Sequence, residues 1–88
     1  MYLEFTLPAG AAGMAAGYTR QLISRNVSAV ADQYGLKWSY STVGYRYYIQ
    51  FEHPEDYTMF ALAWPERVKN SWHQYRVMEG RMPLRKIL

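Results

Sequence analysis

The fold is decided by a stretch near the middle of the chain, residues 36–51, which reads LKWSYSTVGYRYYIQF. Apolar and polar side chains alternate in both of its halves, and a period of two residues is typical of a β-strand with one buried face. Residues 42–44 separate the halves and contain Gly44, so the stretch predicts two strands joined as a hairpin. The alternating apolar positions are Leu36, Trp38 and Tyr40, then Tyr45, Tyr47, Ile49 and Phe51.

A strand and a helix are expected before this hairpin. Residues 2–7 alternate as a strand does, and Pro8 ends the run. The glycine- and alanine-rich residues 9–17 predict a loop that grades into a helix. From 18 to 34 the apolar residues recur at helical spacing, and Gly35 stands where a left-handed C-terminal cap belongs. The helical apolar positions are Ile23, Val27, Val30, Ala31 and Tyr34.

Two more helices are expected after the hairpin. Residues 52–56 place Pro54 and several carboxylates where they favour a helix N-terminus. Helical spacing continues to Pro65, which is expected to stop this helix. A further run of helical spacing predicts a third helix that ends near Glu79. The apolar positions of that third helix are Val68, Trp72 and Tyr75.

The predicted order is strand, helix, strand, strand, helix, which matches the first five elements of a ferredoxin-like β-α-β-β-α-β unit. The pattern is helical where the last strand would come. We therefore expect one α+β domain over residues 1–88 with an extra C-terminal helix, either ferredoxin-like or truncated by the loss of the last strand. Residues 80–88 are a candidate mobile basic tail, and a short edge strand over residues 84–88 is the alternative. The expected core consists of Phe5, Ile23, Val27, Trp38, Ile49, Phe51, Phe60 and Trp64.

Composition favours an ordered domain that works by binding. Half of the 88 residues are hydrophobic and 17% are aromatic, which argues against disorder. The chain has no cysteine, which excludes a disulfide, a thiolate metal site and a thiol nucleophile. No apolar run reaches membrane-spanning length, so we expect a cytoplasmic protein with no membrane contact. We also expect no cofactor.

Positive charge is concentrated at the C-terminal end. Residues 65–88 hold six Lys and Arg against two Glu, a net charge of +4. Residues 1–64 hold four Lys and Arg against five Asp and Glu, a net charge of −1. The C-terminal segment is therefore the part whose field would steer a charged partner.

Two local motifs suggest chemistry but have simpler explanations. The glycines at 10, 13 and 17 follow a strand, but their spacing fits neither a dinucleotide fingerprint nor a P-loop. His53 stands among three carboxylates, which helix capping also explains, and His73 lies in a different predicted helix. We expect no catalytic residue and no metal ligand at either histidine.

Gly44, Tyr45 and Tyr47 resemble the third-strand signature of RNA recognition motifs, which stack bases on exposed aromatic residues. The strand alternation assigns Tyr45 and Tyr47 to the core side. Tyr2 and Tyr48 are the aromatic residues expected on the outer face, which makes that face a poor stacking surface.

A second resemblance extends from the third strand into the following helix. The run Tyr48-Ile49-Gln50-Phe51-x-x-Pro54-x-Asp56-x-x-x-Phe60-x-Leu62-x-Trp64 is similar to a pattern in small uncharacterised proteins of tailed bacteriophages. The resemblance implies a viral source and hence the host cytoplasm. It implies no activity and no site residue.

The C-terminal segment is the predicted functional surface because it interleaves aromatic and basic residues. Our leading hypothesis is a non-enzymatic binding module that acts through self-association or a protein partner. The alternative is a small nucleic-acid-binding accessory protein that uses the same segment. The candidate residues are Arg67, Lys69, Trp72, His73, Tyr75, Arg76, Arg81, Arg85 and Lys86.

Overall fold

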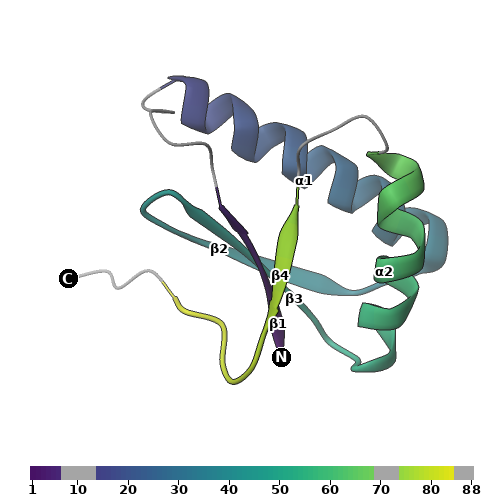
Figure 1. Cartoon of the computed structure of the whole chain (residues 1–88). Helices are drawn as coiled ribbons and strands as arrows, with labels where there is room; N and C mark the ends of the chain where they lie inside the picture. Colours follow the sequence, from purple (N-terminus) through teal and green to yellow (C-terminus); the bar gives the residue numbers. More distant parts are fainter. Residues whose placement is uncertain (7–13, 69–73, 85–88) are drawn as a thin grey trace.

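The structure is a computed structural model that describes residues 1–6, 14–68 and 74–84. It confirms the α+β class (Figure 1). The elements are, in chain order, β1 (Tyr2–Thr6), α1 (Met14–Tyr34), β2 (Trp38–Val43), β3 (Arg46–Phe51), α2 (Glu55–Arg67) and β4 (Tyr75–Met78).

The four strands form one sheet in the order β2-β3-β1-β4, and all neighbouring strands are antiparallel. The predicted hairpin joins β2 to β3, with Val43 paired to Arg46. Gly44 has a φ of 59°, which only glycine adopts easily and which suits the first position of a two-residue type II′ turn. Strands β2 and β4 are the two edges of the sheet.

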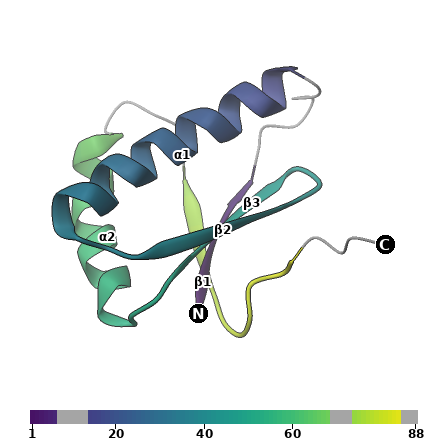
Figure 2. The same ribbon diagram turned by 180° about the vertical axis from the view of Figure 1, so that it is seen from behind.

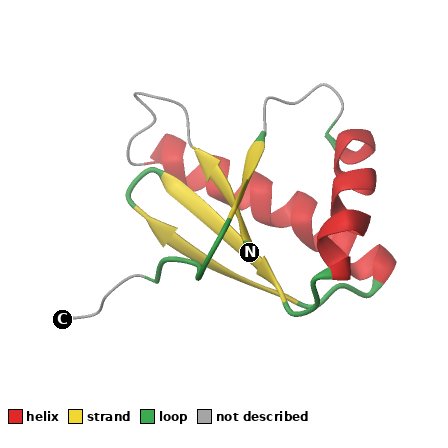
Figure 3. Ribbon diagram, turned by 60° about the horizontal axis from the view of Figure 1, so that its bottom comes forward, coloured by secondary structure: helices red, strands yellow, loops and turns green. Residues whose placement is uncertain are grey.

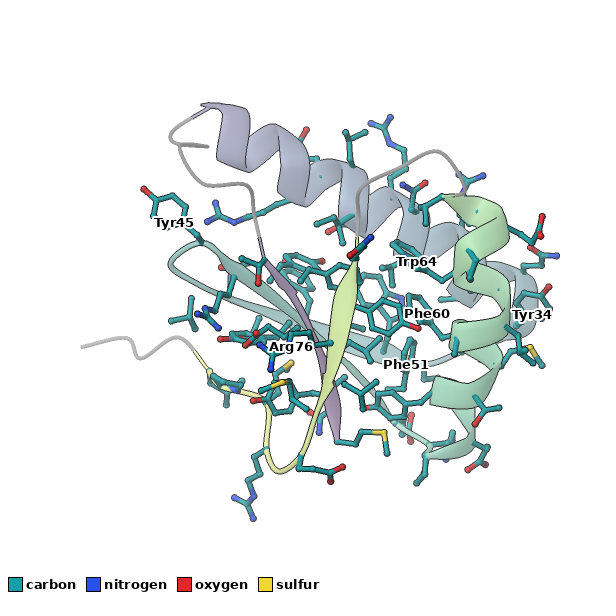
Figure 4. All side chains as sticks on the ribbon, viewed as in Figure 1. Tyr34, Tyr45, Phe51, Phe60, Trp64 and Arg76 are labelled. Atoms are coloured by element: carbon teal, nitrogen blue, oxygen red, sulfur yellow. The ribbon has the colours of Figure 1, made fainter. Side chains whose placement is uncertain are left out.

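Both helices lie on one face of the sheet, which we call the helix face (Figure 3). Phe51 of β3 contacts Phe60 of α2, and Phe60 in turn stacks on Trp64, between the helix and the sheet (Figure 4). The predicted core residues all belong to the main buried cluster except Trp38, which is only partly buried against it. Burying side chains of this size contributes about 1.5–3 kcal/mol each, so this cluster is the main source of stability.

The predicted third helix is wrong, because residues 75–78 form strand β4. Tyr75 pairs with Phe5 and Val77 with Leu3 along the edge of β1. Helical spacing alone could not reveal this strand, because its formation depends on a distant part of the chain. Without β4, one edge of β1 would have no hydrogen-bonding partner, and pairing with that edge outweighs the local sequence pattern. The last strand that the sequence pattern did not provide is therefore present.

Pro65 does not stop α2, which continues to Arg67. A proline in the last turn removes only one intrahelical hydrogen bond, and its fixed φ is compatible with a helix. The N–H of Val68 then closes the helix on the carbonyl oxygen of Trp64 at 3.0 Å. Trp64 and Val68 are both buried, and their packing holds this turn in place.

The opposite face of the sheet, which we call the outer face, has a small cluster of its own. Tyr2 and Tyr48 meet edge to face there, and Met82 from the segment after β4 is buried with them. The N-terminal amino group of Met1 donates to the carbonyl oxygen of Gly80 at 3.0 Å. Residues 80–84 of the predicted mobile tail are thus placed beside β1 and β3, while 85–88 lie outside the described residues.

Neither α1 nor α2 combines the length and the apolar content that a bilayer span requires, and the described residues contain no other helix.

Candidate functional site

The two edges of the sheet differ in length and chemistry. Strand β4 has four residues and carries Arg76, and a short charged strand is one of the usual protections against pairing with another chain. Strand β2 has six residues, Trp-Ser-Tyr-Ser-Thr-Val, with no charge, proline or glycine. Its tryptophan, tyrosine, threonine and valine are residue types that favour extended structure, so β2 is the edge suited to receive another strand.

The hydrogen-bond register shows which residues of β2 face the open edge. The N–H of Glu52 donates to the carbonyl oxygen of Lys37 at 2.9 Å, which makes this a hydrogen-bonded pair. Bonded and non-bonded pairs alternate along an antiparallel ladder. Trp38, Tyr40 and Thr42 are therefore in non-bonded pairs and direct their N–H and C=O groups away from β3. Figure 2 shows β2 from this side, with α1 running above it.

A groove of about 630 Å³ lies between α1 and β2, and we call it the α1–β2 groove. On the strand side, its walls are large rings. On the helix side they are polar, and the serines are small enough to leave space opposite those rings. The lining residues are Arg20, Gln21, Ser24, Arg25, Ser28, Trp38, Tyr40, Thr42 and Tyr47.

Hydrogen bonds fix the helix wall to the hairpin. A terminal nitrogen of Arg20 donates to the carbonyl oxygen of Gly44 at 2.6 Å, and the hydroxyls of Ser24 and Tyr47 share a short hydrogen bond. Burial raises the pKa of the Tyr47 phenol, while the bond to Ser24 acts in the opposite direction. Tyr47 is therefore a neutral hydroxyl at the floor of the groove at physiological pH.

The rings of the strand wall form a continuous stack from the core to the edge. Tyr40 lies parallel to Tyr47, with centroids 5.7 Å apart, and Trp38 is tilted against Tyr40 at 6.2 Å. Tyr47 is fully buried, whereas Tyr40 is 62% exposed. Tyr40 thus offers an apolar face to a ligand without having to move.

The α1–β2 groove is positively charged. Arg20 and Arg25 are among its lining residues, and no lining residue is acidic. The Nε–H of Arg20 is buried and has no acceptor among the described residues. The groove therefore suits a ligand that brings negative charge and hydrogen-bond acceptors.

The described members of the predicted C-terminal surface do not form one site. Tyr75 is a core residue, with its ring 5.6 Å from Phe5 and 5.5 Å from Phe60, because it lies on β4 and not on a helix. Arg67 ends α2 on the helix face, whereas Arg76 stands opposite Glu4 on the outer face. Arg81 is exposed in the segment after β4. The candidates outside the described residues are Lys69, Trp72, His73, Arg85 and Lys86.

The outer face offers no aromatic stacking surface within the described part of the chain. Tyr2 and Tyr48, which were expected to be exposed there, are buried beside Met82. Tyr47 lies in the core as predicted, but Tyr45 is exposed and extends from the hairpin turn (Figure 4). Glu4 is also buried on this face and accepts a 3.1 Å hydrogen bond from Arg46.

His53 is exposed in the turn before α2, and His73 lies outside the described residues. Across 1–6, 14–68 and 74–84, no three potential ligands among His, Cys, Asp and Glu gather closely enough to hold a metal ion.

A second apolar surface lies between the two helices. Tyr34, Met59 and Leu62 are exposed there, and they line a groove of about 340 Å³. Its charged lining residues are Glu66 and Arg67, one of each sign, so the groove shows no charge preference.

Sequence reasoning missed the helix wall of the α1–β2 groove. Arg20, Ser24 and Ser28 follow one another at intervals of four, which places them in one line along α1 beside the buried stripe. That polar line was the available signal for the helix wall of the groove. It indicates a binding site only if β2 is an edge strand, and the sequence pattern does not predict strand order.

Comparisons with protein-family models, with curated proteins and with solved structures gave no match.

Proposed function

We propose that this chain is a non-enzymatic binding module that recognises an extended polypeptide strand along the open edge of β2. The strand would come from a second copy of the chain or from another protein. The observation that carries the proposal is the long, uncharged β2 edge, on which Trp38, Tyr40 and Thr42 direct main-chain donors and acceptors outward. Strand addition to such an edge is a general mode of peptide recognition.

The open edge calls for an explanation because sheet proteins usually protect their edges. Strand β4 at the opposite edge is protected by its shortness and by Arg76. Strand β2 is long and uncharged whereas β4 is protected, and a partner that covers the β2 edge best explains this difference.

The experiment uses Thr42→Pro, which removes one outward N–H while leaving the hydrogen bonds to β3 in place. Thr42→Val is the matched control, because it keeps the N–H and a similar volume. Both variants are compared with the native chain in sedimentation velocity over a range of concentrations, and in binding to short peptides selected from a displayed random library. We expect Thr42→Pro to lose self-association or peptide binding and Thr42→Val to keep it. A monomeric native chain that selects no peptide would refute the proposal.

A nucleic-acid role is the second candidate, and the α1–β2 groove favours it more than the C-terminal segment does. Aromatic rings beside arginines are typical of surfaces that bind single strands. Trp38, Tyr40 and Arg25 provide such a combination. Binding of a labelled oligothymidylate, with affinity that falls steeply as salt rises, would support this candidate.

We also propose that the fold is ferredoxin-like. The element order β-α-β-β-α-β supports this assignment, as does the position of β1 between β3 and β4 with both pairings antiparallel. An experimental structure that includes residues 69–73 tests it through the connection from α2 to β4.

The resemblance of residues 48–64 to small tailed-phage proteins supports a viral source and a place in the host cytoplasm. The neighbourhood of the gene tests this, because adjacent capsid or replication genes are expected for a phage protein.

A further inference from the structure

We infer that the strand bound at β2 is an acidic segment of another protein, with a carboxylate at every second residue directed into the α1–β2 groove. This inference rests on the proposed function and specifies the partner. The main chain of β2, the alternation of side chains in an added strand and the charge of the groove support it.

The main chain of β2 favours a polypeptide partner. Trp38, Tyr40 and Thr42 each direct both an N–H and a C=O toward the open edge. A polypeptide supplies donors and acceptors in the same alternation and satisfies both groups. Phosphate oxygens accept hydrogen bonds but do not donate them, so a sugar-phosphate backbone along this edge would leave the outward carbonyls to water or to isolated base donors. The edge therefore favours a polypeptide.

The side chains of an added strand would alternate between the groove and the outer face. Successive residues of a strand point to opposite faces of the sheet. Every second residue of the incoming segment would enter the α1–β2 groove, beside the exposed ring of Tyr40 and opposite α1. The residues between them would lie on the outer face, next to Ser39 and Ser41 of β2.

The charge of the groove favours an acidic segment. The groove presents Arg20 and Arg25 with no acidic lining residue, and Arg25 is exposed. Carboxylates entering the groove would pair with these guanidinium groups. A second copy would instead bring its own Arg20 and Arg25 to the same face of the extended sheet, and like charges would then oppose each other.

Two synthetic peptides test the inference by fluorescence anisotropy. One alternates valine with glutamate, and the other alternates valine with lysine, so both form strands equally well and differ only in charge. We expect the native chain to bind the glutamate peptide on the order of tenfold more tightly, which corresponds to about 1.4 kcal/mol. The preference should shrink as salt is raised, because the groove is open to solvent.

Charge reversal at the groove provides the sharper readout. We expect Arg25→Glu to weaken binding of the glutamate peptide and to strengthen binding of the lysine peptide, so that the preference between the two peptides is reversed. The matched control is Arg67→Glu, since Arg67 is an exposed arginine at the end of α2 that lines the other groove. It should leave the preference unchanged.

The outcomes separate this inference from the proposed function. If Thr42→Pro abolishes binding of both peptides but the native chain binds the glutamate and lysine peptides equally tightly, strand addition is supported and the acidic partner is refuted. If Thr42→Pro changes neither affinity, strand addition itself fails. If neither peptide binds but oligothymidylate does, and Arg25→Glu removes that binding, the groove is a nucleic-acid site and the inference is overturned.

Discussion

Tyr40 lies parallel to Tyr47 across the β2–β3 ladder, with ring centroids 5.7 Å apart and an angle of 8° between the planes. One ring is part of the core, at 1% exposure, and the other stands at the open edge, at 62%. The stack therefore joins the hydrophobic core directly to the proposed binding surface. It also separates the two roles, because each ring can be removed without the other.

Tyr47→Ala is expected to destabilise the fold by about 3–5 kcal/mol, since it leaves a large cavity in the core. Tyr40→Ala should cost only about 1 kcal/mol, which is the stacking contribution, because little of this side chain is buried. Urea unfolding of both variants checks the difference. Leu62→Ala is the control for loss of an exposed apolar side chain, because Leu62 is 71% exposed on α2. Equal losses for the two tyrosines would show that Tyr40 is structural.

Tyr57→Phe is expected to lower the free energy of unfolding by about 1–2 kcal/mol. The Tyr57 hydroxyl accepts a 3.0 Å hydrogen bond from the N–H of Phe51 and donates a 2.7 Å bond to the carbonyl oxygen of Met1. It thereby ties α2 to the end of β3 and to the residue before β1. Removing it leaves the Phe51 N–H without that acceptor.

Thermal unfolding of Tyr57→Phe, followed by circular dichroism, measures the loss. Tyr45→Phe is the control, because Tyr45 is exposed in the hairpin turn and the described part of the chain gives its hydroxyl no partner. An unchanged midpoint for Tyr57→Phe would mean that water replaces the hydroxyl without cost.

Stability should fall at alkaline pH because burial raises the pKa of Tyr47 and Tyr75 above the ordinary value of 10.0. Above that pH the unfolded chain releases phenolic protons that the folded chain retains. The unfolded state then binds fewer protons, so the free energy of unfolding decreases with rising pH. The contribution is complete below pH 10 and is lost as pH rises through the folded-state pKa values.

Urea unfolding as a function of pH measures this slope, and Tyr47→Phe should reduce it. An identical slope in that variant would mean that Tyr47 ionises equally in the folded and unfolded states.

Sequence periodicity predicted the hairpin, both helices and nearly the whole core, because each depends on local spacing. Tyr47, Ile49 and Phe51 alternate as a strand with one buried face, and they are buried on that face. The long-range pairing of β1 with β4 was not predictable in this way. Tyr75 fits a helix and a strand equally well, and only the unpaired edge of β1 decides between them.

The candidate site was harder to predict than the fold. Trp38 and Tyr40 were correctly assigned to the core side of β2, but their exposure follows from the position of β2 at the edge of the sheet. The polar line at Arg20, Ser24 and Ser28 acquires a role only when that edge lies beside it. Both depend on strand order, which no local pattern contains.

Met82→Ala is expected to destabilise the chain by about 2 kcal/mol, even though Met82 belongs to the segment that was expected to be a mobile tail. Met82 is only 8% exposed, and it is buried with Tyr2 and Tyr48 on the outer face. Removing its side chain uncovers the two rings and leaves the partly buried Met78 of β4 as the hydrophobic residue packed against them. Met82→Leu preserves the volume and should cost less than about 1.5 kcal/mol. Leu84→Ala, two residues further on, should have no effect, because Leu84 is 71% exposed. Urea unfolding ranks the three variants, and hydrogen exchange at Tyr2 and Tyr48 should quicken in Met82→Ala alone. If Met82→Ala is as stable as Leu84→Ala, residues 80–84 do not cover the sheet in solution, and the outer face becomes available to a partner.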